Sequence, residues 1–352
     1  MTLDVEQHAN HLIQHAVLLG ASDIHLLPYT DCYHLYFRIN GQLNWLQSPS
    51  HDWAKRLINY FKYKANMDIG EKRRPQSGAT HLKIEDQQIE LRFSTMTDVA
   101  LNESLVVRVI QTGRQQNQQL ALFFPKQFAL LRQLVKRKSG LILFSGPVGS
   151  GKTTTIYHLL CERVAQQFCQ VITMEDPVEI REPQFLQTQI NELANIHYDD
   201  LIKASLRHHP DILMIGEIRD EETARMVIRG ALTGHLLIAT VHAKDACGVI
   251  ARLQELRITD AQLTQTLIGI VSQRLIPRYC PFCQGSCQLH CPHFHPNAKR
   301  AALLEILTGS ALQQQLLTHT LPANYQVLNH HLRKAWSYGY LDTSTFTQFE
   351  VV

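Results

Sequence analysis

Residues 146–154 form a short stretch of glycines and small or polar side chains that reads Gly146-Pro147-Val148-Gly149-Ser150-Gly151-Lys152-Thr153-Thr154. The stretch matches G-x-x-x-x-G-K-[ST], the P-loop pattern, in which backbone N–H groups surround phosphate oxygens. An apolar run at 141–145 predicts a buried strand before it, and 153–161 predicts a helix whose amino terminus attracts anions. All nine residues are therefore predicted to bind a nucleoside triphosphate, with Lys152 at the β- and γ-phosphates and the Thr153 hydroxyl on Mg²⁺.

The composition is that of an ordinary globular protein. The chain has 352 residues, 45% hydrophobic and 18% charged, which predicts two or three domains. A net charge of +3 is too small to indicate nucleic-acid binding, so no direct DNA contact is expected. The first ten residues lack the apolar core of a signal peptide, and no apolar run approaches the roughly 20 residues of a membrane span. We therefore expect a soluble, cytoplasmic protein.

The first hundred residues predict a small α+β domain. We expect helices and strands at these positions: helices at 6–19 and 53–63, and strands at 33–39, 81–84, 88–94 and 105–110. The stretch that follows is polar and rich in glutamine, which is typical of a linker. The predicted boundaries are 1–112 for this domain and 113–125 for the linker.

Acidic residues follow two further predicted strands, 170–174 and 211–215. Ligands of open α/β sheets bind at the carboxyl ends of strands, so Glu175 and Glu217 are expected near the P-loop. An ordinary P-loop ATPase carries an Asp at the end of the second strand to hold the metal, whereas Gly216 takes that place here. We therefore assign Glu175 to the Mg²⁺ shell or its waters, and we expect Glu217 to polarise the attacking water.

Two histidines flank a fourth predicted strand, 236–241. His235 precedes the strand and His242 follows it, and taken alone each is more typical of a hydrogen-bonded structural histidine than of a catalytic one. The P-loop, both acidic segments and His242 all fall at strand carboxyl ends. This convergence predicts an α/β fold with a RecA-like P-loop ATPase core over residues 126–279.

A cluster of cysteines falls in one short segment: Cys280, Cys283, Cys287 and Cys291. Three histidines are interleaved with them or follow them: His290, His293 and His295. In a reducing compartment such a cluster indicates metal before disulfides, and four soft ligands suit a structural, tetrahedral Zn²⁺. Two alternatives stay open: a histidine replaces one thiolate, or the thiols lie on a loop without metal. Residues 280–295 are predicted as a zinc element.

The remaining segments are predicted to be helical from the spacing of their apolar residues. We expect these helices at 120–138, 263–275, 300–308 and 327–336. Residues 296–352 are accordingly predicted to form a carboxy-terminal helical region.

Several segments resemble the type II secretion and type IV pilus ATPase family. In the amino-terminal half they are Ala21-Ser22-Asp23-Ile24-His25, Arg38-Ile39-Asn40-Gly41, Arg74-Pro75-Gln76-Ser77-Gly78, Arg92-Phe93-Ser94-Thr95 and Val107-Arg108-Val109-Ile110. The acidic segment 175–179, the segment 216–220 and the histidine segment 235–242 are similar to the family's boxes as well. The resemblance covers residues 8–310.

The resemblance implies roles that the residues alone do not fix. It implies that residues 1–112 form a PAS-like domain that packs over the nucleotide of a neighbouring subunit. That domain would supply Arg92 and Arg108 to the phosphates as arginine fingers; without the resemblance, both are typical strand-surface arginines. It implies a catalytic role for His242, and supporting roles for Asp176, Glu179, Arg219 and His235. The implied cofactors are ATP and Mg²⁺, with a structural Zn²⁺ on the four cysteines.

The resemblance also implies a function, ATP hydrolysis by a ring that is expected to be a hexamer. The implied partner is an inner-membrane platform protein, met at the cytoplasmic face of the membrane. A short chain with a cysteine cluster, and without the Ala-Ile-Arg-Asn-Leu-Leu run of retraction ATPases, is similar to motors that assemble a competence pseudopilus for DNA uptake. One alternative is a pilus-retraction or other type II secretion motor. Another class is a nucleotide-gated scaffold with little turnover.

Overall fold

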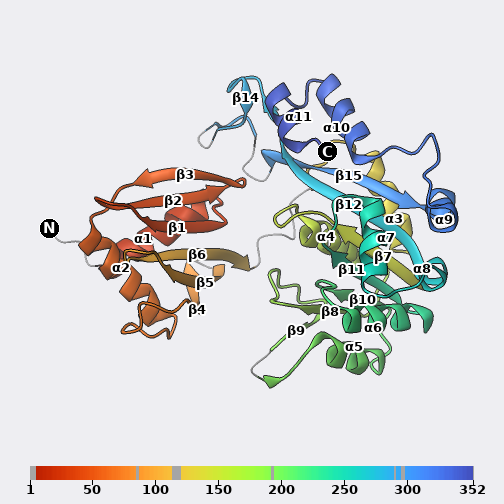
Figure 1. Ribbon diagram of the computed structural model, residues 1–352, viewed down its shortest axis with the longest axis horizontal. Coiled ribbons are helices and arrows are strands. Elements are labelled where there is room, and N and C mark those ends of the chain that lie inside the picture. The colour runs from red at the N-terminus through yellow and green to blue at the C-terminus, as the bar shows by residue number, and fades with distance from the viewer. Residues whose placement is uncertain are drawn as a thin grey trace. The chain divides into compact units, whose positions relative to one another are not determined.

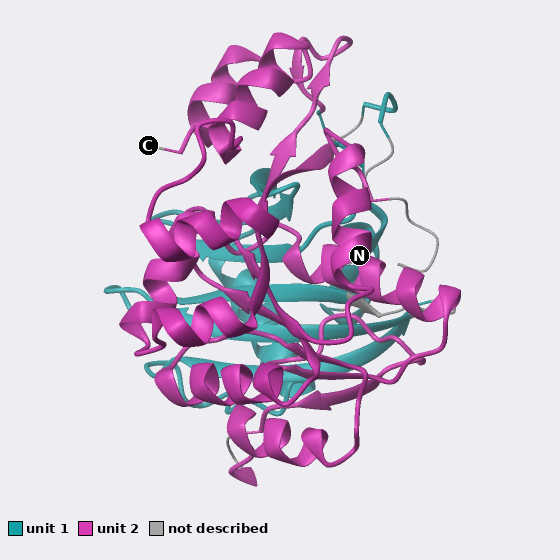
Figure 2. Ribbon diagram, turned by 90° about the vertical axis from the view of Figure 1, so that its right-hand side faces the viewer, with its two compact units in different colours: residues 1–118, 288–299 teal, residues 119–287, 300–352 magenta. Residues whose placement is uncertain are grey.

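The computed structural model (Figure 1) describes residues 5–84, 87–112, 120–191, 194–288, 291–294 and 298–351. The chain divides into two compact units, coloured separately in Figure 2. Unit 1 comprises Met1–Gln118 with Gln288–Lys299, and unit 2 comprises Gln119–Cys287 with Arg300–Val352. Within the described ranges, no helix is long and apolar enough to cross a membrane.

Unit 1 is built on a six-stranded antiparallel sheet in the order β3-β2-β1-β6-β5-β4. Its elements are α1 (Val5–Leu18), β1 (Asp23–Pro28), β2 (Tyr33–Ile39), β3 (Gln42–Gln47), α2 (His51–Lys64), β4 (Gln76–Ile84), β5 (Gln87–Thr97) and β6 (Glu103–Thr112). Side chains of β2 alternate between buried and half-buried, as in a strand with one covered face. Apolar residues of α1 and α2 complete the core, and the predicted helices and strands of this region are confirmed.

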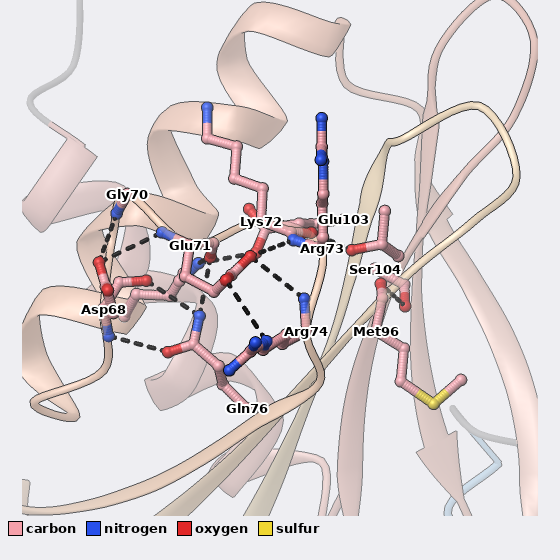
Figure 3. Close-up of polar contacts among 12 residues, drawn as sticks. Asp68, Gly70, Glu71, Lys72, Arg73, Arg74, Gln76, Met96, Glu103 and Ser104 are labelled. Atoms are coloured by element: carbon pink, nitrogen blue, oxygen red, sulfur yellow. Dashed lines mark hydrogen bonds and ion pairs between the residues drawn. The ribbon is translucent and has the colours of Figure 1, made fainter.

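Side chains fix a loop of unit 1 through hydrogen bonds to its backbone (Figure 3), and a buried lysine of α2 adds to them. Lys62 of α2 is fully buried, and its Nζ donates to the Glu71 carbonyl oxygen at 2.6 Å and to Glu103 Oε1 at 2.7 Å. The Gln76 amide donates to the same carbonyl at 2.8 Å, and Glu71 Oε1 accepts the Arg73 N–H at 2.7 Å. This network orders the turn that leads into β4.

Unit 2 is built on a seven-stranded sheet in the order β15-β12-β7-β11-β10-β8-β9. Its strands are β7 (Gly140–Ser145), β8 (Val171–Glu175), β9 (Leu186–Gln189), β10 (Ile212–Ile215), β11 (Leu236–Val241), β12 (Leu267–Pro277) and β15 (Arg300–Thr308), with β13 (Tyr279–Cys280) and β14 (Gly285–Ser286) as a separate pair. All neighbours from β12 to β9 are parallel, and β15 is antiparallel to β12. The predicted parallel sheet is therefore confirmed.

Helices cover both faces of this sheet. They are α3 (Lys126–Leu134), α4 (Lys152–Gln166), α5 (Tyr198–Leu206), α6 (Glu221–Leu232), α7 (Ala246–Glu255), α8 (Asp260–Thr266), α9 (Gly309–Thr318), α10 (Leu328–Ser337) and α11 (Thr343–Phe349). Leu141 and Leu143 of β7 join the core formed with α6 and α7, whereas Ile142 and Phe144 join the core formed with α3 and α4. Because both faces are covered, the strand is apolar at every one of these positions.

Two segments predicted as helices are strands. Most of 263–275 lies in β12, and 300–308 forms β15, so both segments extend the sheet. Each strand is apolar along most of its length and largely buried, and such a run carries no period that separates a strand from a helix. The helix predicted over 120–138 is limited to α3, and the carboxy-terminal region is not wholly helical because it supplies β15. Residues 113–119 of the predicted linker lie outside the described residues.

Candidate nucleotide-binding site

The P-loop connects the end of β7 to the start of α4, as the sequence predicts. Gly146, Gly149 and Gly151 have φ of 144°, 75° and 81°, in the left-handed region that glycine adopts without strain. At Gly146 a Cβ would also lie 2.3 Å from the carbonyl oxygen of Gln273. Strand β12 therefore lies directly against the loop, and only glycine fits at this corner.

Lys152 begins α4, and its side chain is buried. Its Nζ donates to the carbonyl oxygens of Gly146 at 2.8 Å and Pro147 at 3.1 Å. Burial lowers the pKa of Lys152, and the nearby Glu217 carboxylate opposes that change. Both hydrogen-bond partners are neutral carbonyls, so a phosphate would offer the ammonium group a stronger, charged acceptor.

Buried hydroxyls beside the loop fit the same ligand. Ser150 Oγ and Thr155 Oγ1 are buried and have no hydrogen-bond partner among the described residues. Thr153 is half-buried in the first turn of α4. A glycine loop, a buried lysine and unpartnered hydroxyls at a helix amino terminus suit a nucleoside triphosphate with its Mg²⁺.

Four predicted site residues meet at the carboxyl edge of the same sheet. Glu217 follows β10 and pairs with Arg219, and its Oε2 lies 3.6 Å from His242 Nε2. Arg219 Nη1 also pairs with Asp176 Oδ2 at 3.2 Å. The bond to Glu217 raises the pKa of Arg219. The Glu217 carboxylate therefore has Arg219 on one side and His242 on the other. Asp176, Glu217 and His242 follow three adjacent strands, β8, β10 and β11.

Glu175, the last residue of β8, is buried. Its Oε1 accepts hydrogen bonds from the Tyr157 hydroxyl at 2.5 Å and the Thr173 hydroxyl at 2.8 Å. Burial raises the pKa of its carboxyl group, which favours the neutral form. A bound cation would reverse that preference, so the predicted Mg²⁺ role depends on the charge of the metal itself. Glu179 is exposed on the loop that follows.

The two predicted histidines lie at opposite ends of β11. His235 precedes the strand, and its Nδ1 lies 3.1 Å from Thr233 Oγ1. Its carbonyl oxygen accepts the N–H of Gly140, the first residue of β7, at 3.1 Å. A strand of six residues spans about 20 Å, so His235 is at the amino edge of the sheet. The structure brings His242 to the site and does not bring His235 there.

Arg92 and Arg108 lie opposite each other on neighbouring strands of unit 1, β5 and β6. Each is paired with a carboxylate: Arg92 Nη2 lies 2.7 Å from Glu90 Oε1, and Arg108 Nε lies 3.2 Å from Asp23 Oδ1. Arg92 and Arg108 remain 30% and 53% exposed. Their role toward a nucleotide stays a prediction.

The four predicted metal ligands come together. The sulfur atoms of Cys280, Cys283, Cys287 and Cys291 lie within 4.8 Å of one another. Four thiolates at such spacing suit a tetrahedral Zn²⁺. Two histidines considered as alternative ligands, His290 and His295, lie outside the described residues.

Two residues that shape the site were not predicted. Gln273 of β12 donates from Nε2 to the Ser150 carbonyl oxygen at 2.7 Å and so supports the P-loop. Tyr157 of α4 donates to Glu175. The spacing of Tyr157, five residues after Lys152, could have placed it on α4 near the next strand. No local signal marks Gln273, because its contact joins residues far apart in the chain.

The sequence matches the family described as Type II/IV secretion system protein over residues 3–344. It is 38% identical to the competence protein ComGA of Bacillus subtilis (strain 168) over 349 residues, covering 98% of each chain. It is also 36% identical to the type II secretion system protein E of Klebsiella pneumoniae over 309 residues, covering 87% of this chain and 60% of that protein.

Two solved structures share the fold. The ATPase DotB of Legionella pneumophila aligns with a TM-score of 0.75 over 99% of this chain and 96% of its own, at 18% identity. The pilus retraction motor PilT with bound ADP aligns with a TM-score of 0.66 over 96% and 95%, at 24% identity. Identities this low support the fold alone. The family match spans nearly the whole sequence, and the chain therefore belongs to the type II/IV secretion system protein family and is an ATPase of that family.

Proposed function

We propose that the protein is a hexameric ring motor that hydrolyses ATP to assemble a competence pseudopilus for DNA uptake. The observation that supports it most is the carboxyl-edge cluster, in which Arg219 is bonded to Glu217 and His242 lies 3.6 Å from it, on the sheet edge that carries the P-loop. Full-length similarity to a protein named for competence favours this branch of the family. In this proposal, residues 126–279 are a RecA-like core and residues 1–112 are PAS-like.

The site residues have separate tasks in this proposal. Bound Mg²⁺–ATP supplies the phosphoryl group that a water molecule attacks. Lys152 and the backbone N–H groups of the P-loop bind the phosphate oxygens. Glu217 polarises the attacking water, and Arg219 and His242 keep its carboxylate in position. Thr153 and Glu175 would hold the Mg²⁺.

Arg92 and Arg108 supply positive charge to the nucleotide of a neighbouring subunit in this proposal. A carboxylate holds each of them, so a phosphate must replace Glu90 or Asp23 as the partner. An arginine at a transferring phosphoryl group can raise the rate about 10³–10⁵-fold. Alanine at either position should therefore lower kcat strongly, whereas Arg73→Ala, an exposed arginine of the same unit, should not.

The motor acts on a partner at the membrane. We place the protein in the cytoplasm, held at the cytoplasmic face by an inner-membrane platform protein. Nucleotide binding would close a domain or subunit interface and hydrolysis would reopen it, which does the mechanical work. A retraction motor or another type II secretion motor is the second candidate, and a nucleotide-gated scaffold is the candidate from another class.

The competence role is tested by transformation frequency in a source strain that carries Lys152→Ala at this locus. The change removes the ammonium group that binds phosphate and leaves the loop backbone in place. We expect DNA uptake to collapse. Normal uptake would assign the protein to another pilus or secretion system.

A steady-state ATPase assay on Glu217→Gln separates the motor from the scaffold. We expect loss of turnover with ATP binding retained, because the amide keeps the size of the side chain and removes its charge. Turnover equal to that of the wild type would contradict the role assigned to Glu217.

Elemental analysis of the purified protein tests the zinc element. Four clustered thiolates are expected to hold about one equivalent of Zn²⁺. Less than about half an equivalent would count against the site.

A further inference from the structure

Gly216, at the end of β10, has no room for a side chain. A Cβ built there would lie 2.8 Å from the Tyr198 hydroxyl oxygen, 3.1 Å from the Met174 carbonyl oxygen and 3.3 Å from Glu175 Cα. An ordinary P-loop ATPase places the carboxylate that holds Mg²⁺ at this strand end. In this protein a phenol hydroxyl from α5 occupies the space into which such a side chain would extend.

The Tyr198 hydroxyl is buried and has no hydrogen-bond partner among the described residues. Other tyrosine hydroxyls with little access to solvent do have partners: Tyr33 donates to the Glu103 carbonyl at 3.0 Å, Tyr157 to Glu175 and Tyr325 to Glu305 at 3.0 Å. An unpartnered buried hydroxyl destabilises a fold. A purely structural tyrosine would therefore be expected to find a partner, as these three do.

Charged site residues act on the same hydroxyl through their electrostatic field. Burial raises the pKa of Tyr198, and the carboxylates of Glu217 and Asp176 add to the effect. The phenol therefore stays protonated and neutral, and its oxygen keeps lone pairs that can accept a hydrogen bond. Tyr198 is the first residue of α5, so the helix holds the ring in a fixed place beside the sheet edge.

The geometry points to Tyr198 as a further residue of the nucleotide site, whose hydroxyl takes the position of the missing strand-end carboxylate. Its hydroxyl oxygen accepts a hydrogen bond from a water of the Mg²⁺–nucleotide complex, while Glu175 on the adjacent strand supplies negative charge once the cation is bound. A neutral hydroxyl suits this position because Glu217 and Asp176 add negative charge near it, which Arg219 offsets in part. The inference rests on the proposed binding of Mg²⁺–ATP at the P-loop.

Tyr198→Phe tests it, with Tyr325→Phe as the matched control. Without nucleotide, the Tm of Tyr198→Phe should equal or exceed that of the wild type, since the change removes an unpartnered polar atom. The rise in Tm on adding Mg²⁺ with a non-hydrolysable ATP analogue should be smaller than in the wild type, and kcat should fall about 3- to 10-fold. Tyr325→Phe should show the reverse: a lower nucleotide-free Tm, with the nucleotide-induced rise and kcat unchanged.

Two results would overturn the inference alone. One is a Tyr198→Phe protein whose nucleotide-induced rise in Tm and kcat match the wild type. The other is a Tyr198→Phe protein that loses nucleotide-free stability or fails to fold, because its hydroxyl would then be structural. A wild type whose Tm does not rise with Mg²⁺ and the analogue would instead overturn the proposed function, and this inference with it.

Discussion

The two units differ in whether their buried polar groups have hydrogen-bond partners. In unit 1, the ammonium group of Lys62 is bonded to both Glu103 and the Glu71 carbonyl. Around the nucleotide site of unit 2, buried polar atoms lack partners among the described residues. These atoms are Ser145 Oγ, Ser150 Oγ, Thr155 Oγ1, Tyr198 Oη, Ser272 Oγ and Gln273 Oε1. In the described part of unit 1, Thr95 Oγ1 is the one such atom.

This difference separates groups that stabilise the fold from groups that a ligand can satisfy. Each buried unpartnered group costs about 1–3 kcal/mol. A ligand that supplies partners recovers part of that cost and stabilises the state to which it binds. Nucleotide should therefore stabilise unit 2 more than unit 1.

Lys62→Met should cause the largest loss of stability. The change leaves Glu103 buried without its charged partner, and breaking a buried pair from one side costs about 3–5 kcal/mol. Unfolding in urea can be followed by tryptophan fluorescence. In a Trp336→Phe background the remaining tryptophans, Trp45 and Trp53, both report on unit 1.

The double variant Lys62→Met/Glu103→Leu is the control for this prediction. It removes both charges and fills the space with apolar side chains, so it should recover most of the lost stability. Equal losses of stability in the single and double variants would show that the charge pair does not stabilise unit 1. The claim that buried polar groups of unit 1 stabilise its fold would then be wrong.

Glu305 tests whether the difference lies between the units or between the nucleotide site and the rest of unit 2. Its Oε1 accepts a bond from the Tyr325 hydroxyl at 3.0 Å, and its Oε2 accepts the Leu328 N–H at 3.1 Å. Glu305 is thus partnered like the buried groups of unit 1. Burial raises the pKa of its carboxyl group from 4.5 to about 7.

Because the pKa of Glu305 is higher in the folded state, folding is favoured when the group is protonated. That contribution is complete below pH 4.5 and is lost as the pH rises through about 7, which amounts to about 3 kcal/mol. Glu305→Gln cannot ionise. The difference in unfolding free energy between wild type and variant should change by that amount over this range in urea titrations. A difference that is independent of pH would contradict the raised pKa.

Gly216→Ala tests whether the Tyr198 hydroxyl fills the space at the end of β10. The added methyl group meets that oxygen at 2.8 Å, and overpacking of this kind costs about 1–3 kcal/mol. In a Tyr198→Phe background the shortest contact disappears. Calorimetry should therefore show that Gly216→Ala lowers the unfolding free energy less in that background than in the wild type. A cost that is the same in both backgrounds would place the strain on the Met174 carbonyl instead.

The P-loop, the position of Glu217 at a strand end and the grouping of the cysteines could be predicted because each pattern lies in neighbouring residues. The roles of Asp176, Arg219 and His242 came from the resemblance. The position of His235 before β11 was also predicted, whereas its supporting role came from the resemblance alone.

The two strands β12 and β15 could not be predicted. Ala301, Ala302 and Leu303 favour a helix when taken alone, and pairing with β12 overrides that preference.

Long-range contacts explain what else the sequence did not reveal. Tyr198 meets Gly216, and Gln273 supports Ser150, only once the sheet has formed. Neither contact has a local pattern, since each joins elements that are separated along the chain. The sequence revealed the missing carboxylate at Gly216, whereas the residues that fill its place and support the P-loop came from the structure.

The smallest predicted effect compares the same substitution at two buried threonines of unit 2. Thr155 and Thr173 are both fully buried, but only Thr173 has a hydroxyl partner, Glu175 at 2.8 Å. Thr173→Val should cost about 1–2 kcal/mol, because it removes a donor from a buried carboxyl group. Thr155→Val should leave the unfolding free energy unchanged or raise it by up to about 1 kcal/mol, because it removes an unpartnered atom.

Urea unfolding with and without Mg²⁺ and a non-hydrolysable ATP analogue turns this pair into a test of what the unpartnered atoms are for. If the Thr155 hydroxyl finds its hydrogen-bond partner in the bound nucleotide complex, Thr155→Val should gain less stability from the analogue than the wild type gains. An equal gain would mean that the Thr155 hydroxyl is a cost of folding that no ligand recovers. The contrast between the units would then describe packing around the P-loop and not readiness to bind.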